Sequence, residues 1–249
     1  MLINKTLRLD QLLIEKNLVE TKEKAQALIL AGDVKVDGET IPKASNKFSP
    51  DAKIEVKEHL KYVSRGGLKL EEAIRHFQID LKEKVCLDIG SSTGGFTDCL
   101  LQYGAKKVYA TDVGRGLIDW KLRTDKRVVL LENINFRYFD PQLLKDKIEI
   151  ITIDVSFISL DKILPRIKEV INNPANIIAL VKPQFEARRS QVKKGIITDE
   201  NVQLATVDRI RSVAESLGFT YNGTVKSPIQ GAKGNVEFLI YLRGNQSED

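Results

Sequence analysis

The chain has 249 residues and a mass of 28.0 kDa. This is longer than an average single domain of roughly 100 to 200 residues. No uninterrupted apolar run exceeds five residues, far short of the about 20 that a membrane-spanning helix needs. Two cysteines and two histidines exclude a disulfide scaffold and disfavour a zinc site, so we expect no metal. The net charge of +5 is compatible with a polyanionic partner. The first residues carry charges and no apolar signal segment, which favours a cytoplasmic protein.

Residues 1–60 predict a small α+β domain. Residues 7–30 contain two amphipathic helical patterns, the second behind the N-cap candidate Thr21. The Asp37-Gly38 pair marks a turn, and the alternating run at 53–56 is typical of a short half-buried strand. This part has ten Lys/Arg and ten Asp/Glu, so any affinity for nucleic acid must come from their placement on one face.

The run RLDQLLIEKNLVETKEKAQALILAGDVKVDGE resembles the RNA-binding domain first described in ribosomal protein S-four. It has Thr21-Lys22 where that family usually has Ser-Arg, and Val36-Asp37-Gly38 where the family has Val-Asn-Gly. The resemblance implies that residues 1–60 bind RNA. The alternative is a neutral packing module. The basic residues that we expect to contact RNA in this domain are Arg8, Lys22 and Lys24.

A linker is predicted at residues 61–67. Two glycines, Gly66 and Gly67, interrupt regular structure there, and a new helical pattern begins at Leu68. Residues 68–249 would then form the second domain. We count Arg65 of the linker among the candidate RNA contacts.

The second domain alternates apolar strand-like runs with helical stretches, which is typical of a parallel α/β sheet. The expected strands lie at 85–90, 108–112, 128–131, 148–154 and 176–182, and the expected helices at 93–103, 116–124, 160–171 and 199–217. Two further strands at 219–226 and 236–242 follow without a helix between them, which indicates a hairpin at one edge of the sheet. The predicted fold is a Rossmann-like α/β sheet of the class I methyltransferase type.

The first strand opens into a glycine loop, DIGSSTGGF, with the spacing GxxxGG. A dinucleotide site requires GxGxxG, so NAD is disfavoured. Asp112 follows Gly90 by 22 residues, about the offset at which an acid binds ribose hydroxyls. Together these features resemble the S-adenosylmethionine site of methyltransferases. The resemblance implies cofactor contacts from Asp88, Gly90, Ser91, Gly94, Gly95, Phe96, Asp112 and Asp154.

Four further residues resemble the Lys-Asp-Lys-Glu tetrad of the ribose 2′-O-methyltransferases related to FtsJ. They are Lys69, Asp154, Lys182 and Glu237. Lys182 precedes a proline, which keeps it out of a helix, and Glu237 lies in an apolar strand where a carboxylate needs a cationic partner. Lys69 could equally be an exposed helix lysine.

A ribose hydroxyl is a poor nucleophile until its proton leaves. A lysine can accept that proton only where desolvation and a second cation favour its neutral form. We assign Lys182 as this base, with Lys69 placing the ribose and Asp154 and Glu237 orienting the two lysines. This chemistry requires no metal.

Over nearly its whole length the chain resembles the haemolysin A or TlyA family, through DIGSSTGGF, TIDVSFISL, VKPQFE and GNVEF. The resemblance implies 2′-O-methylation of cytidines in ribosomal RNA or ribosomal subunits. The alternatives are an RNA- or ribosome-binding factor without catalysis, a membrane-active haemolysin and a small-molecule methyltransferase.

Residues 183–197 form a long basic connection that suits contact with phosphates, although a solvated charge run is the alternative. Its candidate RNA contacts are Arg188, Arg189, Lys193 and Lys194. A smaller patch comprises Arg123, Lys126 and Arg127, and Phe157 could contact the cofactor or a nucleotide or belong to the core.

Overall fold

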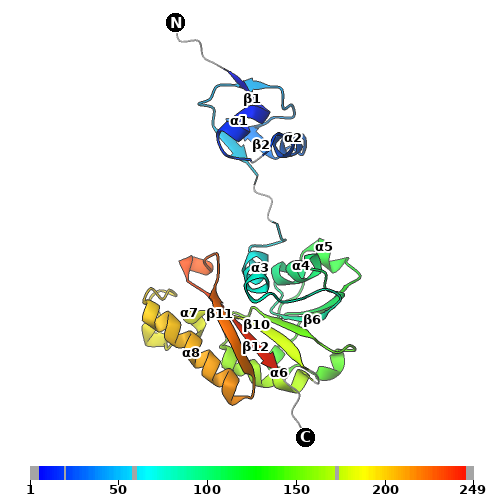
Figure 1. Cartoon of the computed structure of the whole chain (residues 1–249), viewed down its shortest axis with the longest axis vertical. Coiled ribbons are helices and arrows are strands. Elements are labelled where there is room, and N and C mark those ends of the chain that lie inside the picture. Colours follow the sequence, from blue (N-terminus) through cyan, green and yellow to red (C-terminus); the bar gives the residue numbers. More distant parts are fainter. Residues whose placement is uncertain (1–5, 20, 58–60, 172–173, 245–249) are drawn as a thin grey trace. The chain divides into compact units, whose positions relative to one another are not determined.

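The computed structural model describes residues 6–19, 21–57, 61–171 and 174–244. The chain divides into two compact units, Met1–His59 and Leu60–Asp249 (Figure 1). The boundary predicted at residue 60 lies outside the described residues.

The first unit is a small α+β fold. Its helix α2 begins behind Thr21, whose side chain accepts a hydrogen bond from the Lys24 amide at 3.2 Å. Strand β2 pairs with β3 and β5 in an antiparallel sheet, and β1 pairs with β4. The core is formed by leucine, isoleucine and valine side chains of both helices and of β2. The elements are β1 (Leu7–Arg8), α1 (Leu9–Glu15), α2 (Lys22–Leu30), β2 (Val34–Val36), β3 (Glu39–Thr40), β4 (Lys47–Phe48) and β5 (Ile54–Val56).

The second unit contains a seven-stranded sheet in the order β11-β12-β10-β9-β6-β7-β8. Neighbours from β10 to β8 run parallel, whereas β12 is antiparallel to both β10 and β11. The predicted parallel sheet with a hairpin at one edge is therefore confirmed. The strands are β6 (Val85–Ile89), β7 (Lys107–Thr111), β8 (Val128–Leu131), β9 (Ile150–Ile153), β10 (Ala175–Val181), β11 (Thr220–Lys226) and β12 (Phe238–Gly244).

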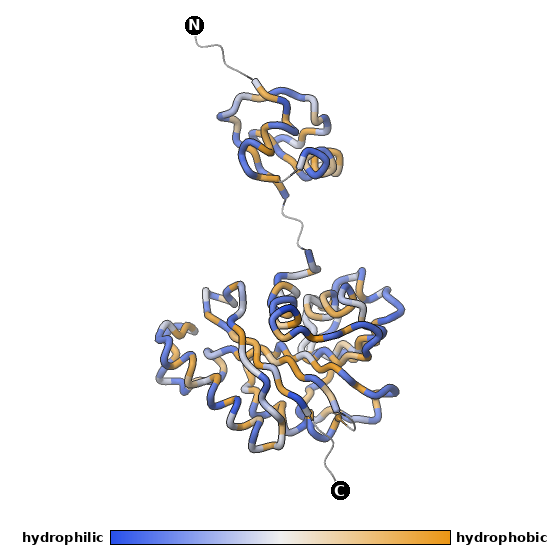
Figure 2. The backbone as a smooth tube through the Cα atoms, in the orientation of Figure 1, coloured by the Kyte–Doolittle hydropathy of each residue, from blue (hydrophilic) through white to orange (hydrophobic). Residues whose placement is uncertain are grey.

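Helices cover both faces of this sheet (Figure 1). One apolar cluster joins the strands to α3 and α4, and a second cluster joins them to α6 and α8. Because both faces are buried, the central strands read as continuous apolar runs, which Figure 2 shows as orange segments inside the unit. The helices are α3 (Gly66–Phe77), α4 (Gly95–Gln102), α5 (Trp120–Arg123), α6 (Leu164–Val170), α7 (Pro183–Glu186) and α8 (Glu200–Ser216). None of the described helices combines the length and hydropathy that crossing a bilayer requires.

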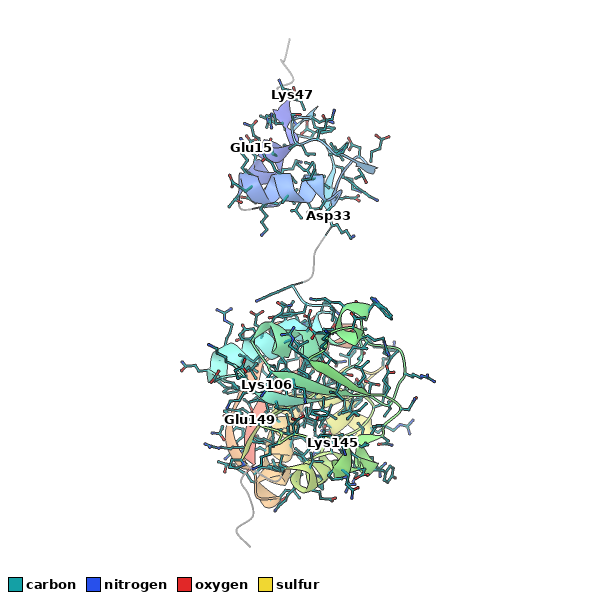
Figure 3. All side chains as sticks on the ribbon, turned by 90° about the vertical axis from the view of Figure 1, so that its right-hand side faces the viewer. Glu15, Asp33, Lys47, Lys106, Lys145 and Glu149 are labelled. Atoms are coloured by element: carbon teal, nitrogen blue, oxygen red, sulfur yellow. The ribbon has the colours of Figure 1, made fainter. Side chains whose placement is uncertain are left out.

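The amino ends of the strands carry ion pairs. Glu149, which precedes β9, lies 2.7 Å from the Lys84 ammonium, and this contact lowers the pKa of the Glu149 carboxyl. Figure 3 shows Lys106 and Glu149 at this same end of the unit. The residues expected to form the site lie at the opposite, carboxyl ends of the strands.

The helix expected to begin at Leu68 begins at Gly66, so the two glycines of the expected linker lie in α3. The physical reason is packing: a Cβ on Gly67 would lie 2.2 Å from the Tyr62 ring, and Tyr62 is only 2% exposed. Residues 61–67 thus pack onto the second unit. Helix α5 is also shorter than expected, because Asp119 caps it and Gly116 has a φ of +71°.

Gly67→Ala should destabilise the second unit by about 1–3 kcal/mol, because the added methyl displaces the Tyr62 ring from the core. Gly66→Ala is the matched control, since the nearest atom to its Cβ lies at 3.5 Å. Urea unfolding of both variants measures the effect. Equal stability of the two variants would contradict the packing argument.

Candidate active site at the carboxyl ends of the strands

The turn after β6 crosses the end of β9 at very close range. Gly90 has a φ of +82°, and a Cβ there would lie 2.5 Å from the carbonyl oxygen of Asp154. Only glycine fits both conditions. The turn separates two adjoining cavities of about 250 and 470 Å³, which share Gly90, Ser92 and Asp154 in their walls.

The smaller cavity, called here the polar cavity, lies between the start of α3, the glycine loop and the β11–β12 loop. Lys69 and Asp154 are among its walls. The larger cavity, called here the apolar cavity, has Asp112 at its edge and mostly aliphatic and aromatic walls. Other residues of the polar cavity are Ser64, Arg65, Ser91, Thr93, Phe96 and Gln230, and those of the apolar cavity include Val113, Leu117, Ile134, Asn135 and Phe136.

Asp112 is held in place by backbone amides. One carboxylate oxygen accepts the Ser92 N–H at 2.8 Å and the other accepts the Gly114 N–H at 2.7 Å. Each oxygen of an ionised carboxylate keeps room for a further donor. The half-buried carboxylate can therefore accept hydrogen bonds from hydroxyl groups of a ligand in the apolar cavity.

Asp88 does not face either cavity, so its expected contact with a cofactor is not supported by the structure. The side chain is fully buried, and its two oxygens accept hydrogen bonds from the hydroxyls of Thr97 at 2.6 Å and Thr152 at 2.8 Å. Asp88 on β6 therefore joins α4, through Thr97, to β9, through Thr152. Burial raises the pKa of Asp88 to about 6. Gly94 likewise lines neither cavity; a Cβ there would lie 2.2 Å from Leu122.

The four tetrad residues form two ion pairs. The Lys69 ammonium on α3 lies 2.5 Å from the Glu237 carboxylate, which directly precedes β12. The Lys182 ammonium, at the end of β10, lies 2.6 Å from the Asp154 carboxylate at the end of β9. All four charges are largely buried, so each requires its partner.

Ser156 gives Lys182 a second partner, which the sequence did not reveal. The Lys182 ammonium donates a hydrogen bond to the Ser156 hydroxyl at 2.8 Å. Phe157 next to it is 91% exposed and not part of the core, and its ring lies 5.0 Å from that of Phe185. Lys182 also lies 6.0 Å from the Phe185 ring centroid. The Ser156 hydroxyl and the Phe185 ring therefore lie beside the proposed base, and Phe157 packs against that ring.

Glu186 is another functional candidate without a sequence signal. Its buried carboxylate accepts hydrogen bonds from the Ser159 hydroxyl at 2.5 Å, the Leu160 amide at 2.8 Å and the Arg209 guanidinium. Burial raises the pKa of Glu186. These bonds fix the turn that follows Lys182 to the loop that follows Asp154.

The β11–β12 loop closes the polar cavity and was also missed. Residues 229–232 form part of the cavity wall, and a Cβ on Gly231 would lie 2.0 Å from the Glu237 carboxylate. In the sequence, only the glycines of this loop could have indicated that it lies close to the site. Asn235 joins the loop to the basic segment by donating to the Gly195 carbonyl at 2.9 Å and accepting from the Ile197 amide at 3.2 Å.

The candidate RNA contacts differ in their availability. The Arg8 guanidinium is bonded to the buried Asp10 carboxylate, and this contact lowers the pKa of Asp10 to about 2. Arg123 and Arg127 are paired with Glu132 and Asp125. The remaining candidates are exposed: Lys22, Lys24, Arg65, Lys126, Arg188, Arg189, Lys193 and Lys194. No cluster suited to a metal ion occurs among the described residues.

Asp88→Asn should change how stability depends on pH. Because the folded-state pKa of about 6 lies above the ordinary value of 3.8, the folded chain binds an extra proton between these values. The free energy of unfolding of the wild type should therefore fall as pH rises, by about 2 kcal/mol more than that of the variant between pH 4.5 and 7. Urea unfolding followed by far-ultraviolet circular dichroism measures this.

Asp146→Asn provides a control of opposite sign, because Lys107 lowers the pKa of the Asp146 carboxyl. Removing the Asp146 carboxylate should lower the free energy of unfolding more at neutral pH than at acid pH. A constant difference between wild type and Asp88→Asn across the pH range would contradict the assignment of Asp88.

Comparison with known proteins places this geometry in a family. The profile of the FtsJ-like methyltransferases matches residues 62–244, and that of the S4 domain matches residues 7–54. Hemolysin A of Brachyspira hyodysenteriae is 45% identical over 238 residues, which cover 95% of this chain and 99% of that protein. The 16S/23S rRNA (cytidine-2'-O)-methyltransferase TlyA of Mycobacterium tuberculosis is 38% identical over 239 residues, which cover 95% of this chain and 89% of that protein.

The fold also recurs among more distant proteins. A solved structure of an S-adenosylmethionine dependent methyltransferase from Mesorhizobium loti has a TM-score of 0.53 at 11% identity and covers 70% of this chain and 96% of that chain. At this identity the likeness concerns the fold alone. From the family profiles and the two relatives, the chain belongs to the FtsJ-like methyltransferases, in the group with an N-terminal S4 domain that includes the TlyA and Hemolysin A proteins.

Proposed function

We propose that this chain uses S-adenosylmethionine to methylate a ribose 2′-hydroxyl of ribosomal RNA, at a cytidine, with Lys182 as general base. The observation that carries the proposal is the pair of buried Lys–carboxylate contacts beside the glycine-loop cavities. The name of the TlyA relative supports the choice of substrate.

The two cavities suit the two halves of the cofactor. Asp112 would bind the ribose hydroxyls of its adenosine, and the apolar cavity would enclose the base. Gly90, Ser91 and Lys69 would surround its charged amino-acid end in the polar cavity. When bound, S-adenosylmethionine supplies a methyl group on a positively charged sulfur, which is already activated for transfer. The cradle around Gly90, which a Cβ would fill, fits such close approach of a ligand to the backbone.

Lys182, as the neutral amine, would take the proton from the 2′-hydroxyl and become the ammonium that Asp154 stabilises. Its nitrogen lies 2.6 Å from the Asp154 carboxylate and 2.8 Å from the Ser156 hydroxyl, so the amine has a defined position behind two residues of the apolar cavity wall. Lys69, oriented by Glu237, would place the ribose and its phosphate. Much of the rate acceleration would come from this alignment of the hydroxyl with the methyl group.

The first unit would dock the enzyme on structured RNA. It matches the S4 domain, and Lys22 and Lys24 lie exposed on α2. Residues 1–60 would thus bind substrate, residues 68–249 would catalyse, and residues 61–67 would connect the two. Because Tyr62 belongs to the core of the second unit, a shortened chain designed to bind the cofactor must include Tyr62. The exposed cations of residues 188–194 would contact phosphates near the site.

Asp112→Ala should weaken binding of S-adenosylmethionine about 10- to 100-fold, the effect of losing about 1.5–3 kcal/mol of hydrogen bonding to a charged acceptor. Titration calorimetry on both proteins measures this. Asp125→Ala, in which the lost carboxylate binds Arg127 and lines neither cavity, should bind normally. Unchanged affinity in Asp112→Ala would remove the proposed ribose contact.

Lys182→Ala should lose about 10²-fold or more in single-turnover rate while binding S-adenosylmethionine nearly as well as the wild type. The wild-type product should resist alkaline cleavage at the modified nucleotide, because a 2′-methyl ether blocks attack on the adjacent phosphate. Lys168→Ala on α6 is the control and should be fully active. An alkali-labile product, or normal turnover of Lys182→Ala, would exclude the proposed mechanism.

A further inference from the structure

Exposed apolar side chains gather at one short segment of the second unit. Nine large hydrophobic side chains are exposed among the described residues, and three of them lie within the eight residues 113–120. Val113 is 70% exposed, Leu117 51% and Trp120 74%. This segment, called here the rim segment, runs from the end of β7 into α5 (Figure 1).

The rim segment borders both cavities. Val113 and Leu117 form part of the wall of the apolar cavity. The Asp119 amide donates to the carbonyl of Thr93 at 3.1 Å, and Thr93 lines the polar cavity. Trp120 follows directly. The segment that carries these side chains therefore lies next to the site.

The backbone of the rim segment is well anchored. The Gly116 amide donates to the Glu132 carboxylate at 2.8 Å, and the Gly114 carbonyl accepts from the Asn133 amide at 3.2 Å. The Asp119 side chain caps α5. The exposed side chains thus stand on a fixed support, which lowers the entropy that binding would cost.

Arg115 and Asp119 give the rim segment one positive and one negative charge. Arg115 is exposed and makes no ion pair or hydrogen bond within the part of the chain that the structure describes. The Asp119 carboxylate already accepts the Lys121 amide at 2.9 Å. An exposed indole and an exposed guanidinium on one segment are groups with which proteins bind unpaired nucleotides, through stacking and phosphate contact.

We propose that the rim segment is a stacking surface for unpaired bases of ribosomal RNA beside the methylated nucleotide, with Trp120 stacking on a base and Arg115 contacting phosphate. This deepens the proposed function and rests on it. Val113 and Leu117 of the same segment line the apolar cavity and Arg115 is exposed, which favours RNA over a second copy of the chain as the occupant.

Trp120→Ala should weaken binding of a ribosomal RNA fragment and raise its KM about 10- to 100-fold, the effect of losing one stacked base. Trp120→Phe should restore most of the affinity, because it keeps an aromatic face. Leu204→Ala removes another exposed apolar side chain, 48% exposed on α8, and should behave as wild type. The affinity for S-adenosylmethionine should stay within about twofold in all three variants, since Trp120 lines neither cavity.

The fluorescence of Trp120 is a direct reporter, because it is the single tryptophan. RNA should protect it from quenching by acrylamide in the wild type. Normal RNA affinity and KM in Trp120→Ala, or equal losses in Leu204→Ala, would overturn the stacking surface in an enzyme that still methylates RNA. Self-association of the wild type that Trp120→Ala abolishes would make a second copy the occupant. A wild type that neither binds nor methylates ribosomal RNA would instead overturn the proposed function.

Discussion

The ion pair between Lys182 and Asp154 joins the carboxyl ends of β10 and β9, and the rest of the site is arranged around it. Two charges at this depth are tolerated only as partners, so the two strand ends must stay in register. Glu186 supports that register by bonding the following turn to the neighbouring loop. Gly90 lets the backbone that follows β6 approach the Asp154 carbonyl more closely than a residue with a Cβ could. The cost of burying unpaired charges and the close backbone contact at Gly90 thus fix how the ends of β6, β9 and β10 lie together.

Most of the second unit could be predicted from its sequence because its sheet is covered on both faces. In a chain where strands and helices alternate, a continuous apolar run as short as residues 177–181 fits a strand buried on both faces better than a helix. The unpredicted start of α3 has a non-local cause. Tyr62 packs where a Cβ of Gly67 would lie, so this turn of the helix needs glycine there, and no local propensity reports that contact.

The site was predictable where a motif carries its own chemistry and not where it depends on pairing. Spacing identified the glycine loop and Asp112. It could not show that Lys69 pairs with Glu237, 168 positions away, rather than with Asp154. For Asp88, sequence position could not show that its two carboxylate oxygens bond to Thr97 and Thr152 and that it lines neither cavity. Glu186 and Ser156 carry no motif, since their roles exist only through contacts between separate loops.

Ion pairing also decides which cations are available to RNA. The chain has 39 basic residues, yet Arg8, Arg123 and Arg127 are held by carboxylates of their own unit. Counting charges therefore overstates the electrostatic part of RNA affinity. Each phosphate contact adds to the salt dependence of binding, whereas stacking on an aromatic ring adds affinity with little of it. In the proposed function, the exposed apolar side chains beside the apolar cavity would add to the affinity that the exposed cations of residues 188–194 provide.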